Sequence, residues 1–474
     1  MALPKKKKTT WQKVRKLFND IHLWLGLGSG LIVIVICFSG TAYVYNTELT
    51  EMAAPHLYEV KQVAGAERIA PEQLVGKVQQ VSGGKVTAVN IPADPGRTYQ
   101  FNVRTKDDKS RFGTTYMVDP YSGEIVGNSL EKNGTKEFMS TMFSLHRWLL
   151  LDKVEQPILS SMTNRELGSK ISGWTTIIFT VGCITGLIIW FPQKVRTWRQ
   201  GLKIKLTGNW KRINHDLHNT LAFYSLIFLL VMGLTGPQWS FEWYRDGLQK
   251  TLGTYKPKPQ GAEGKAGESG GKSQSREAGT ERKEESENKT RGTAAANRGS
   301  GEKKGEAEKS QSSKVSAGTS ASPVEDEQEP LSITAYVAAA SKLLPYKGNY
   351  MVNLPADAKA PVSVSKTRVG FFAPAAGDRL TLDQYTAAAV KVDIFRDKPF
   401  NERIAGSIKA LHVGNVYGGF SKLLYFIACL VATTLPVTGT LIWLNKLKKK
   451  RKRKPLAVQP AKEPAFNSGI LRNA

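Results

Sequence analysis

Two apolar stretches of this 474-residue chain, residues 19–40 and 214–236, share one design. Each is led by a histidine, His22 or His218, and each ends at a glycine 18 residues after that histidine. At about 1.5 Å per residue, a helix of that length spans about 27 Å, close to the hydrocarbon thickness of a bilayer. We interpret the two stretches as copies of one membrane-spanning helix that carries a ligand-type side chain.

Two further stretches, residues 171–193 and 423–445, also lack Asp, Glu, Lys and Arg and repeat each other. Both contain a Thr-Gly pair followed by a tryptophan four residues later, and both are preceded by a Leu-His pair, at His146 and His412. The chain therefore has one plan written twice: span, soluble domain, Leu-His, span. This plan predicts a membrane α-helical fold, a four-helix transmembrane bundle from a duplicated two-span unit, with two α+β domains outside the bilayer.

The plan also predicts where each part begins and ends. We expect a basic N-terminus over 1–20, the first span over 21–46, a soluble domain over 47–145, a histidine segment with the second span over 146–193, a basic loop over 194–213, the third span over 214–240, a disordered insertion over 256–330, a second soluble domain over 331–400, a histidine segment with the fourth span over 408–445, and a basic tail over 446–474. The insertion is rich in Gly, Ser, Lys and Glu, a composition that buries too little apolar surface to fold. A near match to a phosphate-binding loop at 271–273 is rejected, because Ala266 replaces its first glycine.

Charge sets the expected orientation. The net charge of +27 is concentrated beside the spans, which favours a lipid bilayer and argues against nucleic acid as the partner. Basic flanks belong in the cytoplasm, so both termini are expected there and both soluble domains on the outer side. A cleaved signal peptide is the competing interpretation of residues 1–45, but this segment repeats the internal stretch led by His218.

The histidines are the candidate site residues. His22 and His218 should meet on the cytoplasmic side, and His146 and His412 on the outer side, one from each half of the repeat. Paired imidazoles without carboxylate or thiolate partners suit haem b iron better than zinc or calcium, although a single interfacial histidine is more often a capping residue. His215, one turn before His218, stays an alternative ligand.

The cysteines and the sixth histidine exclude other chemistry. The three cysteines lie inside apolar stretches without a Cys-x-x-Cys or Cys-x-x-Cys-His motif, which excludes dithiol redox chemistry and covalent c-type haem. They are expected to be small packing residues. His56 falls in the first soluble domain without a partner and is expected at the surface.

On these residues the chain resembles the PepSY-associated transmembrane family, which includes iron-regulated inner-membrane ferric-siderophore reductases. The resemblance is carried by His22-Leu-Trp-Leu-Gly26, Ser39-Gly40, Asp119-Pro-Tyr-Ser-Gly-Glu-Ile-Val, Leu145-His146-Arg147, Asp216-Leu-His218, Thr235-Gly236, Leu411-His412 and Thr438-Gly439. It implies a bacterial inner-membrane protein with periplasmic PepSY domains and two b-type haems, held by His22 with His218 and by His146 with His412. Such a protein would be an oxidoreductase that passes electrons to a ferric siderophore or other Fe(III) chelate and releases Fe(II) for uptake.

Two features of the sequence depart from the family pattern, and two alternative functions compete with the reductase. The insert at 151–170 lengthens the segment after His146 and is expected to alter or cap the outer site, and Ala387 replaces a glycine usual in PepSY turns. No dinucleotide fingerprint is present, so the electron donor must be a quinol or a cytoplasmic reductase. The alternative is a haem-free, membrane-anchored PepSY protein that binds or regulates a periplasmic partner. A transporter is less well supported, because we expect no buried carboxylates and few helix breaks in the spans, features that midplane substrate sites usually need.

Overall fold

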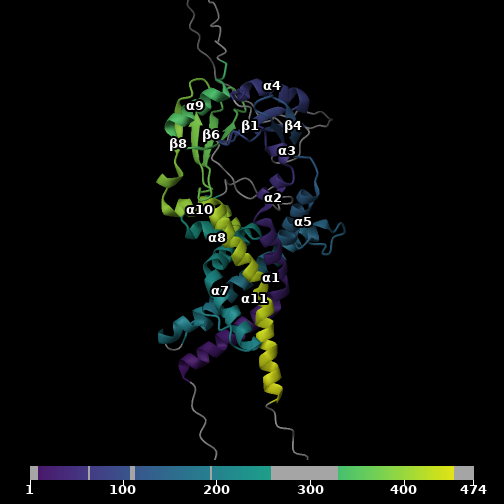
Figure 1. The fold of residues 1–474 in the computed structure, drawn as a ribbon, viewed down its shortest axis with the longest axis vertical. Coiled ribbons are helices and arrows are strands. Elements are labelled where there is room, and N and C mark those ends of the chain that lie inside the picture. Colours follow the sequence, from purple (N-terminus) through teal and green to yellow (C-terminus); the bar gives the residue numbers. More distant parts are fainter. Residues whose placement is uncertain (1–8, 62–64, 107–112, 193–194, 258–328, 453–474) are drawn as a thin grey trace, which may run out of the picture. The chain divides into compact units, whose positions relative to one another are not determined.

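The computed structural model describes residues 9–61, 65–106, 113–192, 195–257 and 329–452 (Figure 1). The insertion predicted over 256–330 lies almost wholly outside the described residues. The same holds for the first eight residues and for most of the basic tail.

Four long helices form the transmembrane part. They are α1 (Thr10–Tyr43), α6 (Asn164–Trp190), α7 (Trp210–Thr235) and α11 (Gly418–Lys452). All four are long and apolar enough to cross a membrane, so the prediction of a multi-pass membrane protein with four spans is confirmed. All four begin earlier than the expected spans: α1 at Thr10 instead of 21, α6 at Asn164 instead of 171, α7 at Trp210 instead of 214 and α11 at Gly418 instead of 423.

Each long helix packs against two neighbours. α1 contacts α6 and α11, and α7 contacts the same two helices, so α1 and α7 lie across the bundle from each other. Small residues permit close approach: a Cβ on Gly233 would come within 2.4 Å of Thr180, and one on Gly30 within 3.2 Å of Pro436. The three cysteines are free, as expected, and lie in or beside the apolar cluster around Leu229 in the bundle interior.

Eight antiparallel strands form one sheet in the order β4-β3-β2-β1-β5-β6-β7-β8. The strands are β1 (Lys85–Ile91), β2 (Tyr99–Arg104), β3 (Thr114–Val118), β4 (Ile125–Asn128), β5 (Gly348–Asn353), β6 (Val362–Arg368), β7 (Asp378–Leu382) and β8 (Ala389–Asp393). Helix α4 (Pro71–Ser82) and helix α9 (Ile333–Leu343) pack on one apolar core with the central strands.

The two predicted soluble domains are joined, because their strands form one sheet and share one core. Strand β1 pairs with β5 in a register that sets Val89 opposite Val352 and Ile91 opposite Tyr350. An isolated four-stranded unit would leave β1 or β5 as an open edge with unpaired backbone groups. Pairing the two edges satisfies those groups and joins the halves.

Short helices connect the sheet to the bundle. They are α2 (Asn46–Met52), α3 (Pro55–Tyr58), α5 (Gly134–Trp148), α8 (Glu242–Thr251) and α10 (Phe400–Val413), with 3-10 turns η1 (Leu151–Lys153), η2 (Val195–Leu202), η3 (Pro237–Trp239) and η4 (Phe395–Asp397). His146 lies on α5 and His412 on α10, and both helices contact the bundle. The helix that carries His146 thus begins at Gly134, inside the segment assigned to the first soluble domain.

One tight turn occurs at the same place in both halves of the sheet. The Asp119 carboxylate accepts a hydrogen bond from the Tyr121 amide at 2.8 Å, and the Asp383 carboxylate accepts one from the Tyr385 amide at 3.0 Å. Each turn needs a left-handed residue at its fifth position, where Gly123 has φ of 68° and Ala387 has φ of 53°. A side chain in this conformation costs about 1–2 kcal/mol, so Ala387 is a strained residue.

We predict that Ala387→Gly stabilises the protein by about 0.5–1 kcal/mol, because the relief of strain exceeds the entropy lost by adding a glycine. The matched change, Gly123→Ala, should destabilise it, since a Cβ there would also come within 3.0 Å of the Leu74 side chain. Thermal unfolding of the detergent-solubilised protein measures both. Equal and same-signed shifts for the two variants would contradict the assignment of strain to Ala387.

Candidate functional site

Each of the four predicted ligand histidines is packed against a glycine of a neighbouring long helix. A Cβ added to the glycine would lie close to the nearest atom of the histidine ring. The distance is 3.1 Å for Gly186 and His22, 3.3 Å for Gly439 and His218, 3.1 Å for Gly40 and His146, and 3.4 Å for Gly236 and His412. A serine or threonine precedes the glycine in every case. We call each Ser/Thr-Gly pair a histidine seat.

The glycines of the seats make room for an imidazole, at Gly40, Gly186, Gly236 and Gly439. The missing side chain also uncovers a helix carbonyl four residues earlier, because side chains at i and i+4 lie one above the other. The ring hydrogen-bonds to that carbonyl in two seats, His22 to Gly182 and His146 to Ile36. In the other two seats the ring hydrogen-bonds to the hydroxyl of the threonine before the glycine, His218 to Thr438 and His412 to Thr235.

These hydrogen bonds define the tautomer. His22 Nδ1 lies 3.0 Å from the Gly182 carbonyl and His146 Nδ1 lies 2.9 Å from the Ile36 carbonyl. A carbonyl only accepts, so Nδ1 must carry the proton. His218 Nδ1 donates to the Thr438 hydroxyl at 2.8 Å, because that hydroxyl already donates to the backbone of its own helix.

His412 follows the same rule, donating from Nδ1 to the Thr235 hydroxyl at 3.0 Å. In all four histidines Nε2 is therefore the unprotonated nitrogen. An imidazole held in this way is oriented to bind a metal through Nε2.

The structure brings the histidines together in the two predicted pairs. The ring centres of His22 and His218 are 6.5 Å apart, and those of His146 and His412 are 6.2 Å apart. With a metal–nitrogen distance of about 2.0 Å and about 1.2 Å from nitrogen to ring centre, two imidazoles on opposite sides of one metal lie about 6.4 Å apart. Both pairs match this spacing.

Two imidazoles do not complete the coordination of a bare metal ion. No group of three or more His, Cys, Asp or Glu residues with metal-binding geometry occurs in the part of the chain that the structure describes. The other coordination positions could be filled by a planar macrocycle, as in haem, or by water. Gly26, one turn after His22, and Gly182, one turn before Gly186, would meet nothing within 4 Å with an added Cβ, which leaves space for such a ring.

The outer pair lies in a more crowded setting than the inner pair. The ring centres of Trp239 and His412 lie 4.8 Å apart in an edge-on arrangement. The Arg147 side chain donates a hydrogen bond to the Trp239 carbonyl at 3.3 Å. Burial lowers the pKa of both His146 and His412, and the nearby Arg147 charge adds to this effect. Both rings are consequently neutral near pH 7, the protonation state that a metal ligand requires.

The other two histidines are placed apart from the pairs. His215 is half-exposed and lies 3.6 Å from Asp216, while His218 is the residue that faces His22. His56 is exposed, as expected, but it has a partner: its Nε2 lies 2.8 Å from Glu131.

The insert after His146 does not separate the outer pair. Residues 149–163 form a loop that contains η1 and leads into α6. Sequence reasoning missed the contacts that this region makes, including those of Arg147 and Trp239. The arginine that directly follows His146 in the sequence is the feature from which these contacts could have been predicted.

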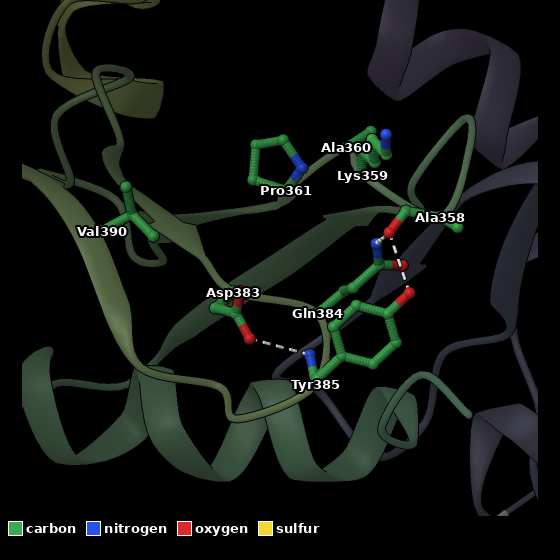
Figure 2. Close-up of a pocket in the computed structure, with 8 residues that line it drawn as sticks. All are labelled: Ala358, Lys359, Ala360, Pro361, Asp383, Gln384, Tyr385 and Val390. Carbon is green, nitrogen blue, oxygen red and sulfur yellow. Dashed lines mark hydrogen bonds between the residues drawn. The ribbon is translucent and has the colours of Figure 1, made fainter. Parts of the chain in front are cut away.

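A surface hollow near the Asp383 turn contains none of these histidines (Figure 2). There the Ala358 carbonyl accepts hydrogen bonds from Gln384 Nε2 at 2.5 Å and from the Tyr385 hydroxyl at 2.8 Å. Tyr121 makes the corresponding bond to the Pro95 carbonyl in the first half. These contacts stabilise the turn.

The four-helix bundle, the sheet and the histidine seats all lie in the segment matched by one family model. The model for the PepSY-associated TM region matches residues 20–446. The chain belongs to this family. No curated protein matches the sequence. The match to the PepSY-associated TM region includes all four seated histidines.

We predict that Gly40→Val disturbs the outer pair, because the added side chain must displace the His146 ring. Overpacking of this kind costs about 1–3 kcal/mol and should lower the thermal unfolding midpoint in detergent. Gly28→Val on the same helix is the matched control, since a Cβ there meets nothing within 4 Å. Similar midpoints for the two variants would show that the seat is not a packing constraint.

Proposed function

We propose that this protein carries electrons across the membrane through two b-type haems and reduces an Fe(III) chelate on the outer side. The observation that carries the proposal is the recurrence of one geometry: two histidine pairs with ring centres 6.5 and 6.2 Å apart. Both pairs have Nδ1 engaged and Nε2 free. Structural capping histidines have no reason to repeat this spacing twice.

The residues of the chain would act by holding and insulating the cofactor. His22 with His218 would hold the inner haem, and His146 with His412 the outer one. Bound haem supplies one-electron chemistry, with its potential set by axial ligands, charge and burial. The seats fix the imidazoles, and the apolar cluster around Leu229 keeps water out of the bundle interior.

The proposal includes an orientation and an origin by duplication. Arg15 near the start of α1 donates to the Ile189 carbonyl near the end of α6, so basic residues gather at the end of the bundle that holds the inner pair. The positive-inside rule then puts this end and both termini in the cytoplasm, and the sheet in the periplasm of a bacterium. The repeated order of span, sheet unit, histidine helix and span supports descent from a duplicated two-span unit.

We predict that a reporter enzyme that folds only in the periplasm is active when inserted after Gly253 and inactive when inserted in the loop at Gly208. The first position follows α8 on the side of the sheet, and the second precedes α7 within the basic loop. The reverse pattern of reporter activity would overturn the orientation.

The acceptor follows from coordination chemistry and from the family resemblance. Hard oxygen ligands bind Fe(III) more strongly than Fe(II), so one-electron reduction would weaken a ferric siderophore or similar chelate and release Fe(II). The electron must come from a quinol or a cytoplasmic reductase, because the sequence contains no dinucleotide-binding fingerprint.

We predict that the purified protein contains about two low-spin b-type haems per chain, read from oxidised and dithionite-reduced spectra and from the haem-to-protein ratio. His218→Ala and His412→Ala should each remove about one haem, because each change deletes one ligand of a different pair. An Fe(III) chelate added to the reduced protein should reoxidise it.

The controls are His215→Ala and His56→Ala, which change histidines outside the pairs and should leave the haem content intact. If the protein purified after expression with ample haem supply contains no haem, the reductase proposal is contradicted. The alternative, a membrane-anchored PepSY binding protein, is then favoured.

A further inference from the structure

Arg147 reaches from one half of the outer histidine pair towards the other. It follows His146 on α5, and its guanidinium donates to the carbonyl of Trp239 at 3.3 Å. The Trp239 ring in turn contacts the ring of His412. The Arg147 side chain therefore lies beside both histidines of the outer pair.

A second arginine shares the same surroundings. The Arg165 guanidinium lies 4.0 Å from the centre of the Trp148 ring, and the Arg147 guanidinium lies 5.7 Å from the centre of the same ring. Stacking on an indole is a favourable position for a guanidinium, but it places two positive charges near each other.

Neither arginine forms an ion pair with an acidic side chain among the described residues. The acidic residues close to them in sequence are engaged elsewhere, Asp152 with the Ser144 hydroxyl and Glu166 with Lys170. The basic residue nearest to His218 in sequence behaves differently: Arg212 is paired with the buried Asp216 at 2.9 Å.

Arg147 is half-buried, whereas Arg165 is exposed, and a half-buried cation without an anion needs a counter-charge. Charged groups that leave water are normally paired. A guanidinium has five N–H donors in a planar fork that fits a carboxylate, and among the described residues the Arg147 guanidinium donates to one acceptor, the Trp239 carbonyl. Val413 follows His412 in the second half, so this cationic feature belongs to the first half alone.

We propose that Arg147, supported by Arg165, binds a carboxylate beside the outer histidine pair. The identity of the carboxylate rests on the proposed function: it is either a propionate of the outer haem or a carboxylate of the incoming Fe(III) chelate. In both cases the arginines position an anion next to the outer histidine pair, from which the electron would leave. They also raise the affinity of this end of the bundle for anionic ligands.

The test compares the full-length wild-type protein with Arg147→Gln, Arg147→Lys and Arg165→Gln. Arg245→Gln is the matched control, since Arg245 already has acidic partners in Glu242 and Asp246. The wild-type haem-to-protein ratio is measured first and tests the proposed function independently. The variants are then examined by redox titration, by the propionate band of the resonance Raman spectrum, and by binding of Fe(III)–citrate and of Fe(III)–acetohydroxamate, which has no carboxylate.

For a haem propionate, Arg147→Gln should shift one of the two redox transitions to lower potential and shift the propionate band, with citrate binding unchanged. For a chelate carboxylate, it should weaken Fe(III)–citrate binding on the order of tenfold, the loss expected for a charged hydrogen bond, without affecting acetohydroxamate binding. Arg147→Lys should recover only part of either effect, because a lysine lacks the planar fork.

The proposal is overturned if Arg147→Gln and Arg245→Gln behave alike in all four measurements, or if both iron complexes lose affinity equally. Should the wild-type protein hold no haem, the proposed function and the propionate source fail together. Citrate binding then still decides whether the arginines form a carboxylate site.

Discussion

The hydrogen bond from a histidine Nδ1 into a neighbouring helix is the contact on which the functional architecture depends. It fixes the tautomer, turns Nε2 away from the seat and sets the ring against a glycine. A helix carbonyl already accepts from its own i+4 amide, but its second lone pair is open to a side chain when residue i+4 has no Cβ. The glycine therefore supplies the space in every seat and uncovers a carbonyl acceptor in two of them, and the hydroxyl of the preceding threonine accepts from the ring in three of the four.

The two histidine pairs differ in what holds them. His22 and His218 lie on the long helices, so packing of the bundle alone brings them together. His146 and His412 lie on short helices that follow the sheet in sequence, and their separation depends on how the sheet meets the bundle. Ion pairs lie at this junction, including Glu48 with Lys422 at 2.5 Å. Because β1 and β5 join the halves, loss of the sheet would affect the outer pair more than the inner one.

Sequence alone predicted the spans and the pairing of the histidines, because an uncharged run of helical length has few alternatives and the repeat links each residue to a counterpart. It could not predict that the sheet is continuous. Alternation marks which residues face the core, but it does not say which edge of one unit meets which edge of another. The start of α6 was also missed, because its first turns carry Arg165, Glu166 and Lys170 and lack the apolar signal of a span.

The loop after His146 shows why an insertion in one half need not be a neutral addition. Leu149 and Leu150 both adopt positive φ, 55° and 61°, a conformation that costs about 1–2 kcal/mol per residue and persists only where the surroundings impose it. The Leu149 amide donates to the Leu145 carbonyl and the Leu150 amide to the Ser144 carbonyl, which closes the end of the helix. The buried Asn164 side chain holds the following part of the loop, donating to the carbonyls of Val154 and Gln156 and accepting from the amide of Ile158. The loop is thus anchored at both ends, and its ordered path brings the first turn of α6, with Arg165, back to the helix that carries His146.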